Sequence, residues 1–413
     1  MEYDVIVVGG GASGLFLAAH TAAGGKRTLV LEKRERPARK LLITGKGRCN
    51  LCNDCDRDAF LQNCIRGGRF LYSAIAAFTP QDTMAYFEGL GVPLVTERGQ
   101  RVFPASQRAM DVVDALVRAV KDAGAQIRCA TVAEVLCEEG RVRGVRTAAG
   151  ERYYADNIVI ATGGMSYPAT GSSGDGYRFA RALGHTVAPP APALAPLDTK
   201  EPWVRELAGL SLRNVTLSLW DQKKPKKPVF QELGELLFTH TGLSGPLVLT
   251  ACSLLDPARA SDFSVAIDLK PGLDRTALDR RLLRDFEERQ NRDFCNALDA
   301  LLPRSLIPVI VRLTGIPPET KVHSLTRTQR EALIGPVKGL TLHIKAPGPL
   351  EEAIITRGGV KLSEIAPSTM RSKLAEGLYF TGEVIDADAL TGGFNLQIAF
   401  STAYLAAQDI LGA

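Results

Sequence analysis

The sequence has no long apolar segment near its start. It begins Met1-Glu2-Tyr3-Asp4, and the apolar run that follows ends at Val8. A secretory signal needs an apolar stretch of about 7–15 residues, and a membrane-spanning helix needs about 20. We therefore expect a cytoplasmic protein that is not associated with a membrane.

A large excess of charge of either sign is also missing. The 50 Lys and Arg residues and the 45 Asp and Glu residues leave a formal net charge of +5 over 413 residues. This small positive net charge is compatible with a nucleic-acid partner but is not evidence for one. Hydrophobic residues make up 45% of the chain and charged residues 23%, which excludes disordered, collagen-like and coiled-coil proteins. The length predicts two or three domains of about 100–200 residues each.

The eight cysteines do not indicate a disulfide framework, because the chain is long and shows no export signal. We therefore expect reduced thiols. Cys49, Cys52 and Cys55 form an evenly spaced run, with Cys64 beyond it. This run is compatible with a metal or iron–sulfur site, with a redox-active pair, or with separate small thiols. We favour separate thiols and predict no metal, since such a site normally takes four ligands.

A glycine-rich turn near the N-terminus predicts a dinucleotide site. The β-branched run 4–8 precedes Gly9-Gly10-Gly11-Ala12-Ser13-Gly14, and we expect an apolar helix to follow as far as Ala23. In this pattern the first glycine allows a tight turn, the second lets the backbone approach a pyrophosphate, and the third lets helix and strand pack closely. The N–H groups at the start of the helix then bind phosphate. A plain strand–helix turn is the alternative.

Glu32 supports the dinucleotide interpretation. It ends the next expected strand, 28–32, and lies 18 residues after Gly14. A carboxylate at this place accepts hydrogen bonds from the two ribose hydroxyls of an adenosine and repels a 2′-phosphate. No second glycine fingerprint follows a strand further along the chain. A single such site in a redox protein favours a resident flavin over a visiting nicotinamide.

Two more glycine-rich strand ends predict further parts of a cofactor site. The run 157–161 ends in Thr162-Gly163-Gly164, and the strand expected at 377–381 leads into Gly382-Glu383. An apolar helix is then expected just after Gly393, and its N-terminus would place N–H groups near a flavin. Each pattern also fits an ordinary turn, and Asp386 and Asp388 in particular fit a solvated loop.

These stretches together resemble the BaiN/YhiN-like (RdsA-type) FAD-dependent oxidoreductase family, also labelled aminoacetone-oxidase-like flavoproteins. The matching segments are GGGASG at 9–14, RKLLITGKGRCN at 39–50, ATGGMSYPATGSSGDGY at 161–177, FTHTGLSGP at 238–246, TRGGV at 356–360 and GLYFTGEVIDADALTGGFNLQIA at 377–399. The resemblance covers nearly the whole chain in family order. Several of these segments are not general flavoprotein motifs, so the match is specific.

The resemblance implies an α/β fold with a discontinuous Rossmann-like, glutathione-reductase-like FAD-binding domain at 1–190 and 350–413. A β-barrel-like domain is expected at 191–270, after a Pro-rich connector at 188–196, and a small helical domain at 271–349. Alternation of apolar residues predicts strands at 215–220 and 263–268, and apolar spacing predicts a helix from Arg275.

The resemblance also implies which residues hold the FAD. It puts Glu32 on the ribose, and Arg39 and Lys40 beside phosphate or ribityl groups. The residues predicted to bind the cofactor are Gly9, Gly11, Ala12, Ser13, Gly14, Glu32, Lys33, Arg39, Lys40, Gly47, Arg48, Thr162, Gly163, Gly164, Gly382, Glu383, Gly393, Asn395, Leu396 and Gln397.

Two residues are candidates for catalysis. Cys49 carries a thiol whose ordinary pKa of about 8.5 keeps it protonated at neutral pH, so it could donate a proton beside a flavin hydride. Packing within its loop is the alternative role. The resemblance places Arg357 near the flavin face, where a cation could stabilise anionic reduced flavin. The alternative is a surface arginine beside a turn.

The resemblance implies three possible reactions: reduction of conjugated double bonds in steroid acids, oxidation of aminoacetone, and reduction of uridine to dihydrouridine in large-subunit ribosomal RNA. We favour the ribosomal RNA reaction, with NAD(P)H as transient reductant of FAD. The basic stretch Lys223–Lys227 and six arginines in 275–292 could contact phosphates, although such charges also fit solvated faces. A small-molecule flavin reductase or oxidase and a non-enzymatic, flavin-bearing RNA-binding protein remain the alternatives.

Overall fold

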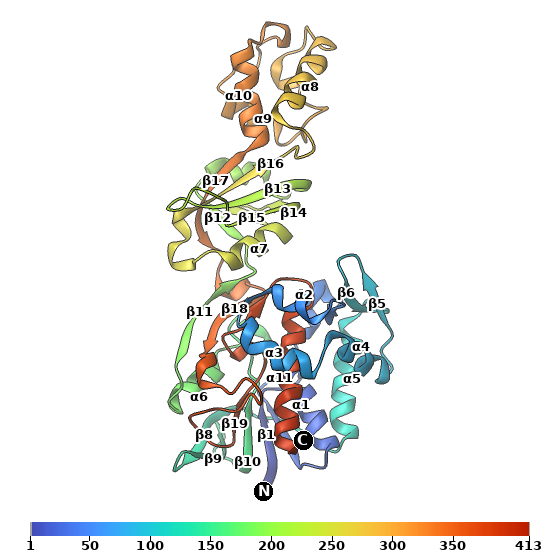
Figure 1. Ribbon diagram of the computed structural model, residues 1–413, viewed down its shortest axis with the longest axis vertical. Helices are drawn as coiled ribbons and strands as arrows, with labels where there is room; N and C mark the ends of the chain where they lie inside the picture. Colours follow the sequence, from blue (N-terminus) through green and yellow to red (C-terminus); the bar gives the residue numbers. More distant parts are fainter. Residues whose placement is uncertain (1, 413) are drawn as a thin grey trace. The chain divides into compact units, whose positions relative to one another are not determined.

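The computed structural model describes residues 2–412 and divides the chain into two compact units. The first unit takes the chain as far as Ala193 and resumes at Leu350, so it is discontinuous. The second unit is Leu194–Pro349. Figure 1 shows both units, with labels on helices and strands of each.

A seven-stranded sheet forms the centre of the first unit. Its order is β7-β2-β1-β10-β9-β8, and β19 pairs with β10. The strands are β1 (Glu2–Val8), β2 (Thr28–Glu32), β7 (Gln126–Cys129), β8 (Val132–Glu138), β9 (Arg141–Thr147), β10 (Arg152–Ile160) and β19 (Leu378–Phe380). The pairs β7–β2, β2–β1, β1–β10 and β10–β19 are parallel. The carboxyl ends of these parallel strands therefore meet at one edge of the sheet, where ligands of open α/β sheets bind.

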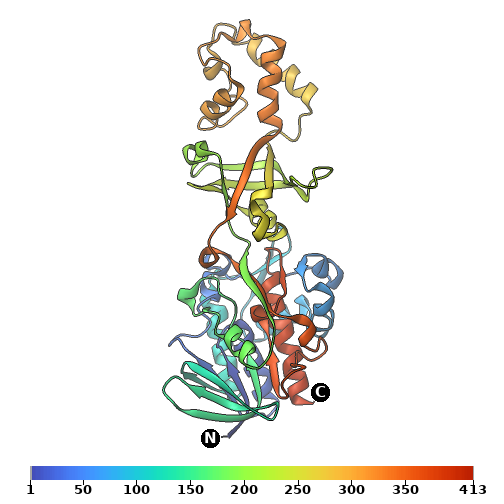
Figure 2. The same cartoon turned by 90° about the vertical axis from the view of Figure 1, so that its left-hand side faces the viewer.

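The central strands are apolar on both faces because each face is covered by a separate core. Val5 and Val7 of β1 pack into one core, whereas Ile6 and Val8 pack into the other. This double burial explains the continuous β-branched run in the sequence. In the first core α1, α5 and α11 run side by side (Figures 1 and 2), and α1 contacts both of the others. The helices of this unit are α1 (Ala12–Ala23), α2 (Arg57–Gln62), α3 (Gly68–Ala77), α4 (Pro80–Gly89), α5 (Ala109–Asp122), α6 (Asp175–Ala182) and α11 (Phe394–Leu411).

Three small sheets complete the first unit. Their strands are β3 (Cys52–Asn53), β5 (Leu94–Glu97) and β6 (Arg101–Pro104) in one, β4 (Cys64–Arg66) and β20 (Asp388–Ala389) in another, and β11 (Val187–Ala193) and β18 (Ile355–Val360) in the third. The Pro-rich stretch expected to be a connector therefore forms strand β11 over most of its length. Proline is tolerated there because β11 pairs on one side only, with β18.

The second unit contains a closed six-stranded barrel and a group of helices. The barrel order is β12-β15-β14-β13-β16-β17. Its strands are β12 (Leu197–Thr199), β13 (Ser211–Asp221), β14 (Phe230–Phe238), β15 (Gly242–Ser244), β16 (Phe263–Asp268) and β17 (Leu340–Pro347), and its helices are α7 (Pro246–Leu254), α8 (Arg275–Glu287), α9 (Ile307–Thr314) and α10 (Arg327–Lys338). The strands and the helix expected from apolar spacing are present as β13, β16 and α8.

One stretch of the expected helical region is a strand instead. In Figure 2, α10 leads directly into β17, which closes the barrel between β12 and β16. Leu340, Leu342 and Ile344 are buried while the residues between them are exposed. This two-residue period is that of a strand with one face in a core, so the segment expected to be a helical domain, 271–349, also contains a strand of the barrel at 340–347.

Within residues 2–412, no helix combines the length and the apolar character that crossing a lipid bilayer requires.

Candidate cofactor site

The glycine turn between β1 and α1 has two glycines that the fold itself requires. Gly9 has a φ of +106°, and a Cβ added there would lie 2.6 Å from the Ala161 carbonyl oxygen. A Cβ on Gly14 would lie 2.0 Å from the Gly9 carbonyl oxygen. Neither position has room for a side chain, because helix and strands approach each other closely there. Both glycines would be needed with or without a bound cofactor.

Gly11 is different, and it tests whether the site fits a dinucleotide. A Cβ on Gly11 would meet nothing closer than the Ala161 carbonyl oxygen at 4.0 Å, so packing does not demand glycine. Gly11 is the N-cap residue of α1, which has no side-chain cap and no acid in its first turn. Its backbone N–H groups are thus available to an anion. A phosphate lying against the backbone accounts for this glycine, and the turn fits FAD.

Glu32 lies at the end of β2, beside the same turn. Its Oε2 accepts a hydrogen bond from the Gly10 backbone N–H at 2.8 Å, and its Oε1 accepts one from the Arg34 N–H at 2.9 Å. These bonds fix the carboxylate at the carboxyl edge of the sheet. Each oxygen keeps a further lone pair, so the carboxylate can also accept from ribose hydroxyls.

Lys40 and Glu383 form the centre of a polar cluster drawn from four distant segments. Lys40 Nζ lies 2.8 Å from Glu383 Oε2 and donates to Ser166 Oγ at 2.6 Å. Glu383 Oε1 accepts from the Thr356 backbone N–H at 2.8 Å. Both charged side chains are about three-quarters buried, with exposed fractions of 24% and 21%. The cluster joins the loop after β2 to the ends of β10 and β19 and to β18.

The glycines after β10 pack tightly against this cluster. A Cβ on Gly164 would lie 2.4 Å from Thr356 Oγ1, and Gly163 has a φ of +71°. Thr162 Oγ1 is buried without a hydrogen-bond partner in residues 2–412. Gly382, after β19, also has a positive φ, +73°. All of these residues lie at the carboxyl edge that holds Gly11 and Glu32.

The N-terminus of α11 contributes backbone groups rather than side chains. A Cβ on Gly393 would lie 2.2 Å from the Cys52 carbonyl oxygen, so this glycine is required by packing. Asn395 bonds the Ala389 backbone N–H and carbonyl oxygen, both at 2.9 Å. Gln397 is buried and donates from Nε2 to the Phe78 carbonyl oxygen at 3.1 Å. Leu396 packs against the first core. Any contact of these residues with a cofactor would use the backbone of the first turn of α11.

Several charged residues predicted to bind the cofactor have protein partners. Lys33 Nζ pairs with Asp175 Oδ2 at 2.7 Å and bonds Ser173. Arg48 Nη1 donates to Glu97 at 2.8 Å, and its guanidinium lies 4.1 Å from the centre of the Phe103 ring. Arg39 is exposed, as is Gly47. Ser13 Oγ donates to Thr381 Oγ1 at 2.8 Å, so its side chain also has a protein partner.

Cys49 lies inside the first core rather than on a site surface. Its exposed fraction is 0%, its φ is +62°, and burial raises the pKa of its thiol to about 12. A thiol with no exposed surface touches a substrate only if its loop moves. Burial also raises the pKa of Cys55 to about 11 and that of Cys64 to about 12.

All eight cysteines are free thiols. Across the described part of the chain, 2–412, no three or more His, Cys, Asp or Glu side chains come together as a potential metal-binding group.

Sequence reasoning missed three residues of this region. Ser166 and Thr356 join the Lys40–Glu383 cluster, and both lie inside the segments that carry the family resemblance, which was the available signal. Asp388 fitted a solvated turn, but it is only 2% exposed and pairs with Arg66 at 2.5 Å. Its local sequence carries no sign of burial, because the burial depends on β4, which lies far away in the chain.

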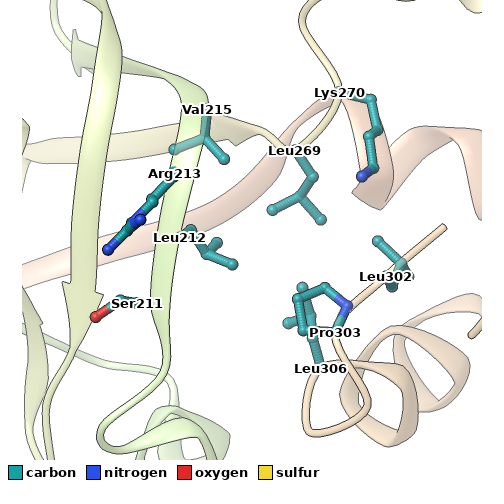
Figure 3. Close-up of a pocket in the computed structure, with 9 residues that line it drawn as sticks. All are labelled: Ser211, Leu212, Arg213, Val215, Leu269, Lys270, Leu302, Pro303 and Leu306. Atoms are coloured by element: carbon teal, nitrogen blue, oxygen red, sulfur yellow. The ribbon is translucent and has the colours of Figure 1, made fainter. Parts of the chain in front are cut away.

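A cavity of about 260 Å³ lies in the second unit, apart from all these residues. Its lining includes Leu212, Leu269 and Leu306, with Lys270 beside them (Figure 3). Burial lowers the pKa of Lys270, and the nearby Arg281 lowers it further. None of the residues predicted to bind the cofactor or to act in catalysis lines this cavity.

The fold and the residues at the carboxyl edge of its sheet indicate the class of protein. A Rossmann-type sheet, an uncapped helix N-terminus behind an open glycine, and a carboxylate at the end of the second strand are features of dinucleotide-binding folds. The chain belongs to the family described as HI0933-like protein Rossmann domain, whose model matches residues 3–409. It is therefore an enzyme, and a non-enzymatic RNA-binding protein is no longer an alternative.

Curated relatives match the chain over nearly its full length. A ribosomal RNA dihydrouridine synthase of Escherichia coli is 32% identical over 417 residues, 100% of this chain and 99% of the relative. A 3-dehydro-bile acid delta(4,6)-reductase of Clostridium scindens is 30% identical over 406 residues, 97% of each chain.

Solved structures show the same fold at low identity. An open flavocytochrome c3 fumarate reductase matches with a TM-score of 0.53 and 15% identity, over 100% of this chain and 78% of that one. A 3-ketosteroid delta1-dehydrogenase from Sterolibacterium denitrificans matches with a TM-score of 0.51 and 14% identity, over 100% and 99%.

Proposed function

We propose that this enzyme reduces an activated carbon–carbon double bond, with NAD(P)H as transient reductant of FAD. The observation that carries the FAD site is the open space in front of Gly11, at an uncapped helix N-terminus beside the Glu32 carboxylate. The full-length similarity to a dihydrouridine synthase and to a bile acid reductase supports the reaction. When bound, FAD supplies the hydride for such a reduction. Because the sequence has a single glycine fingerprint, we propose that NAD(P)H docks only briefly at the flavin face.

The residues proposed to hold FAD divide by the part of the cofactor that they would contact. The backbone N–H groups of Gly11, Ala12 and Ser13 would bind the pyrophosphate, and Glu32 the ribose. Glu383, held by Lys40, would lie at the ribityl chain. The backbone from Gly393 to Leu396 would approach the flavin pyrimidine. Thr162, Gly163, Gly164 and Gly382 would line the path between them, with Lys33, Arg39, Gly47 and Arg48 at its margin.

Reduction of a double bond adds a hydride to one carbon and a proton to its neighbour. We propose Arg357 as the cation that stabilises negative charge on the reduced cofactor. Cys49 is the proposed proton donor, since its raised pKa keeps the thiol protonated. This role requires the loop Thr44–Cys49 to open. Lys46 and Cys49 in that loop have φ values of +60° and +62°, a backbone state that side chains disfavour and that opening would relieve.

The proposed substrate is uridine in large-subunit ribosomal RNA, which would place the reaction in the cytoplasm. The full-length similarity to a ribosomal RNA dihydrouridine synthase supports it. Of the basic features, the β13–β14 hairpin tip supports it best, because Lys224, Lys226 and Lys227 are exposed and have no ion pair in the described part of the chain. The arginines of 275–292 support it less, since most of them pair with acids, as Arg289 does with Asp299.

Nucleoside analysis of ribosomal RNA tests this substrate directly. Dihydrouridine in 23S ribosomal RNA would be measured by mass spectrometry in cells with and without the gene. Loss on deletion and restoration by the wild-type gene are expected. Dihydrouridine at an unchanged level in the deletion strain would refute the RNA substrate.

A small-molecule substrate is the second candidate, and the full-length similarity to a bile acid reductase favours it. Purified protein containing FAD would be mixed with NAD(P)H and a panel of enones, and also with aminoacetone for the oxidase reaction. Cofactor oxidation driven by a small enone but not by ribosomal RNA would assign the enzyme to this second class.

A further inference from the structure

Thr356 joins β18 to the loop that follows β10 through its side-chain hydroxyl. Thr356 Oγ1 accepts a hydrogen bond from the Met165 backbone N–H at 2.8 Å and another from the Ser166 backbone N–H at 3.0 Å. Thr356 is 2% exposed and Ser166 is 0% exposed, so the bond between them is shielded from water. A buried N–H group that loses its acceptor is costly, and the hydroxyl therefore determines where this loop lies.

The same threonine is linked to the Glu383 carboxylate by two routes. Its backbone N–H donates directly to Glu383 Oε1 at 2.8 Å. The second route passes through Ser166, whose Oγ lies 3.3 Å from Glu383 Oε1 and accepts from Lys40 Nζ at 2.6 Å. Because the Thr356 hydroxyl holds the Ser166 backbone, it also fixes the Ser166 hydroxyl beside the carboxylate.

The surroundings of Thr356 favour a small side chain that carries an acceptor. Gly164 lies so close that a Cβ there would be 2.4 Å from Thr356 Oγ1, which leaves little room for a longer side chain at position 356. Valine has nearly the shape of threonine, but its methyl group cannot accept a hydrogen bond. Serine and threonine are therefore the residues best suited to hold this loop from β18.

We propose that Thr356 is a positioning residue of the cofactor site, whose hydroxyl fixes the Met165–Ser166 backbone and, through Ser166, the Glu383 carboxylate. The inference rests on the proposed place of Glu383 at the ribityl chain of FAD. Without the hydroxyl, the loop and the carboxylate are less ordered before FAD arrives. Binding must then order them, and this ordering lowers the affinity.

A pair of substitutions that differ only by the hydroxyl group tests this role. Thr356→Ala and Thr356→Ser both remove the threonine methyl group, but only serine keeps the acceptor. FAD affinity would be measured by quenching of flavin fluorescence on titration of each apoprotein. We expect Thr356→Ala to bind FAD about tenfold more weakly than the wild type, the usual scale for coupled neighbours. Thr356→Ser should bind FAD with nearly wild-type affinity, and Glu383→Gln at least as weakly as Thr356→Ala.

A double variant tests the route through Ser166. Ser166→Ala keeps the backbone N–H but removes the hydroxyl that lies beside Glu383. In that background Thr356→Ala should lower FAD affinity by a smaller factor than it does in the wild type, because part of its effect passes through the missing hydroxyl. Additive effects of the two substitutions would refute this route.

Thr147→Ala is the matched control. Thr147 is 1% exposed, and its Oγ1 accepts from the Glu151 backbone N–H at 3.1 Å, but it lies in β9. Loss of this hydroxyl should lower the melting temperature of the apoprotein and leave FAD affinity at the wild-type value. The melting temperature of every apoprotein variant would be measured, because a merely structural role of Thr356 would lower it without changing FAD affinity.

Distinct results overturn distinct parts of the argument. Wild-type FAD affinity in Thr356→Ala, or equal losses in Thr356→Ala and Thr356→Ser, would refute the positioning role of the hydroxyl. Unchanged affinity in Glu383→Gln would instead refute the proposed place of Glu383. If the Thr356→Ala apoprotein does not fold, Thr356→Val takes its place, and wild-type FAD affinity in that variant would refute the positioning role.

Discussion

Replacement of Gly11 by alanine separates the cofactor role of the glycine turn from its packing role. The new methyl group would meet no protein atom closer than 4.0 Å. The backbone there, with φ −82° and ψ −168°, is open to alanine. Alanine is a weaker N-cap than glycine but restricts the unfolded chain more, so the free energy of unfolding of the apoprotein should change by less than about 1 kcal/mol.

FAD binding should respond very differently to the same change. The methyl group would occupy the space in which a phosphate approaches the backbone, and overpacking of this kind costs about 1–3 kcal/mol, or roughly a 5- to 150-fold loss of affinity. FAD affinity would be measured by quenching of flavin fluorescence, and apoprotein stability by urea unfolding. Gly89→Ala is the control, because a Cβ at Gly89 would meet nothing within 4 Å and the residue lies away from the sheet edge, in α4. Wild-type FAD affinity in Gly11→Ala would refute the argument that a phosphate lies against this backbone.

Three further predictions concern side chains of the first unit and the hairpin tip. Cys49→Ser places a hydroxyl in an apolar core and should lower the free energy of unfolding, measured in urea, by about 1–3 kcal/mol. If this variant keeps normal stability and FAD content but loses turnover, the thiol is instead identified as the proton donor. Lys40→Met should lower the free energy of unfolding by about 1–3 kcal/mol because Glu383 loses its partner, and Lys40→Met combined with Glu383→Gln should recover part of that loss in the same assay. Replacing Lys224, Lys226 and Lys227 by serine should make ribosomal RNA binding less sensitive to salt. In filter binding, the slope of log affinity against log salt concentration should become shallower by about 0.7 for each phosphate contact that is lost. Lys321→Ser, which removes a lysine already paired with Asp293 at 2.7 Å, is the control. A wild-type slope in the triple variant would argue against the hairpin tip as a contact for RNA.

The glycine turn illustrates how sequence and structure divide the evidence. The strand, the glycines and the helix could be predicted because each is a local pattern, and Glu32 could be placed by its spacing. The pattern also predicted a separate reason for each glycine, but the close approach of the Ala161 carbonyl oxygen to Gly9, and the space that it leaves at Gly11, depend on a distant segment of the chain. Only the folded structure distinguishes the glycines that packing requires from the one that it leaves open.

Side-chain partners were the least predictable part of the site. Arg48, Asn395 and Gln397 lie in segments that carry the family resemblance, yet their side chains bond to the protein. Their contact with a cofactor remains a prediction, because the direction of a polar side chain depends on the nearest partner in space. Those partners come from other segments, as Phe78 does for Gln397.

By itself, the sequence determined the class of fold, and its ordered motifs determined the family, whose resemblance implied the discontinuous course of the first unit. Periodicity, glycine spacing and the order of motifs are local or linear properties. The tertiary structure alone decided that Lys40 meets Glu383 across 343 residues, that Cys49 and Asp388 are buried, and that β17 closes the barrel. The physical reason is the same in each case. Burial and charge pairing depend on which distant segments come into contact, and a single segment of sequence carries no record of its neighbours in space.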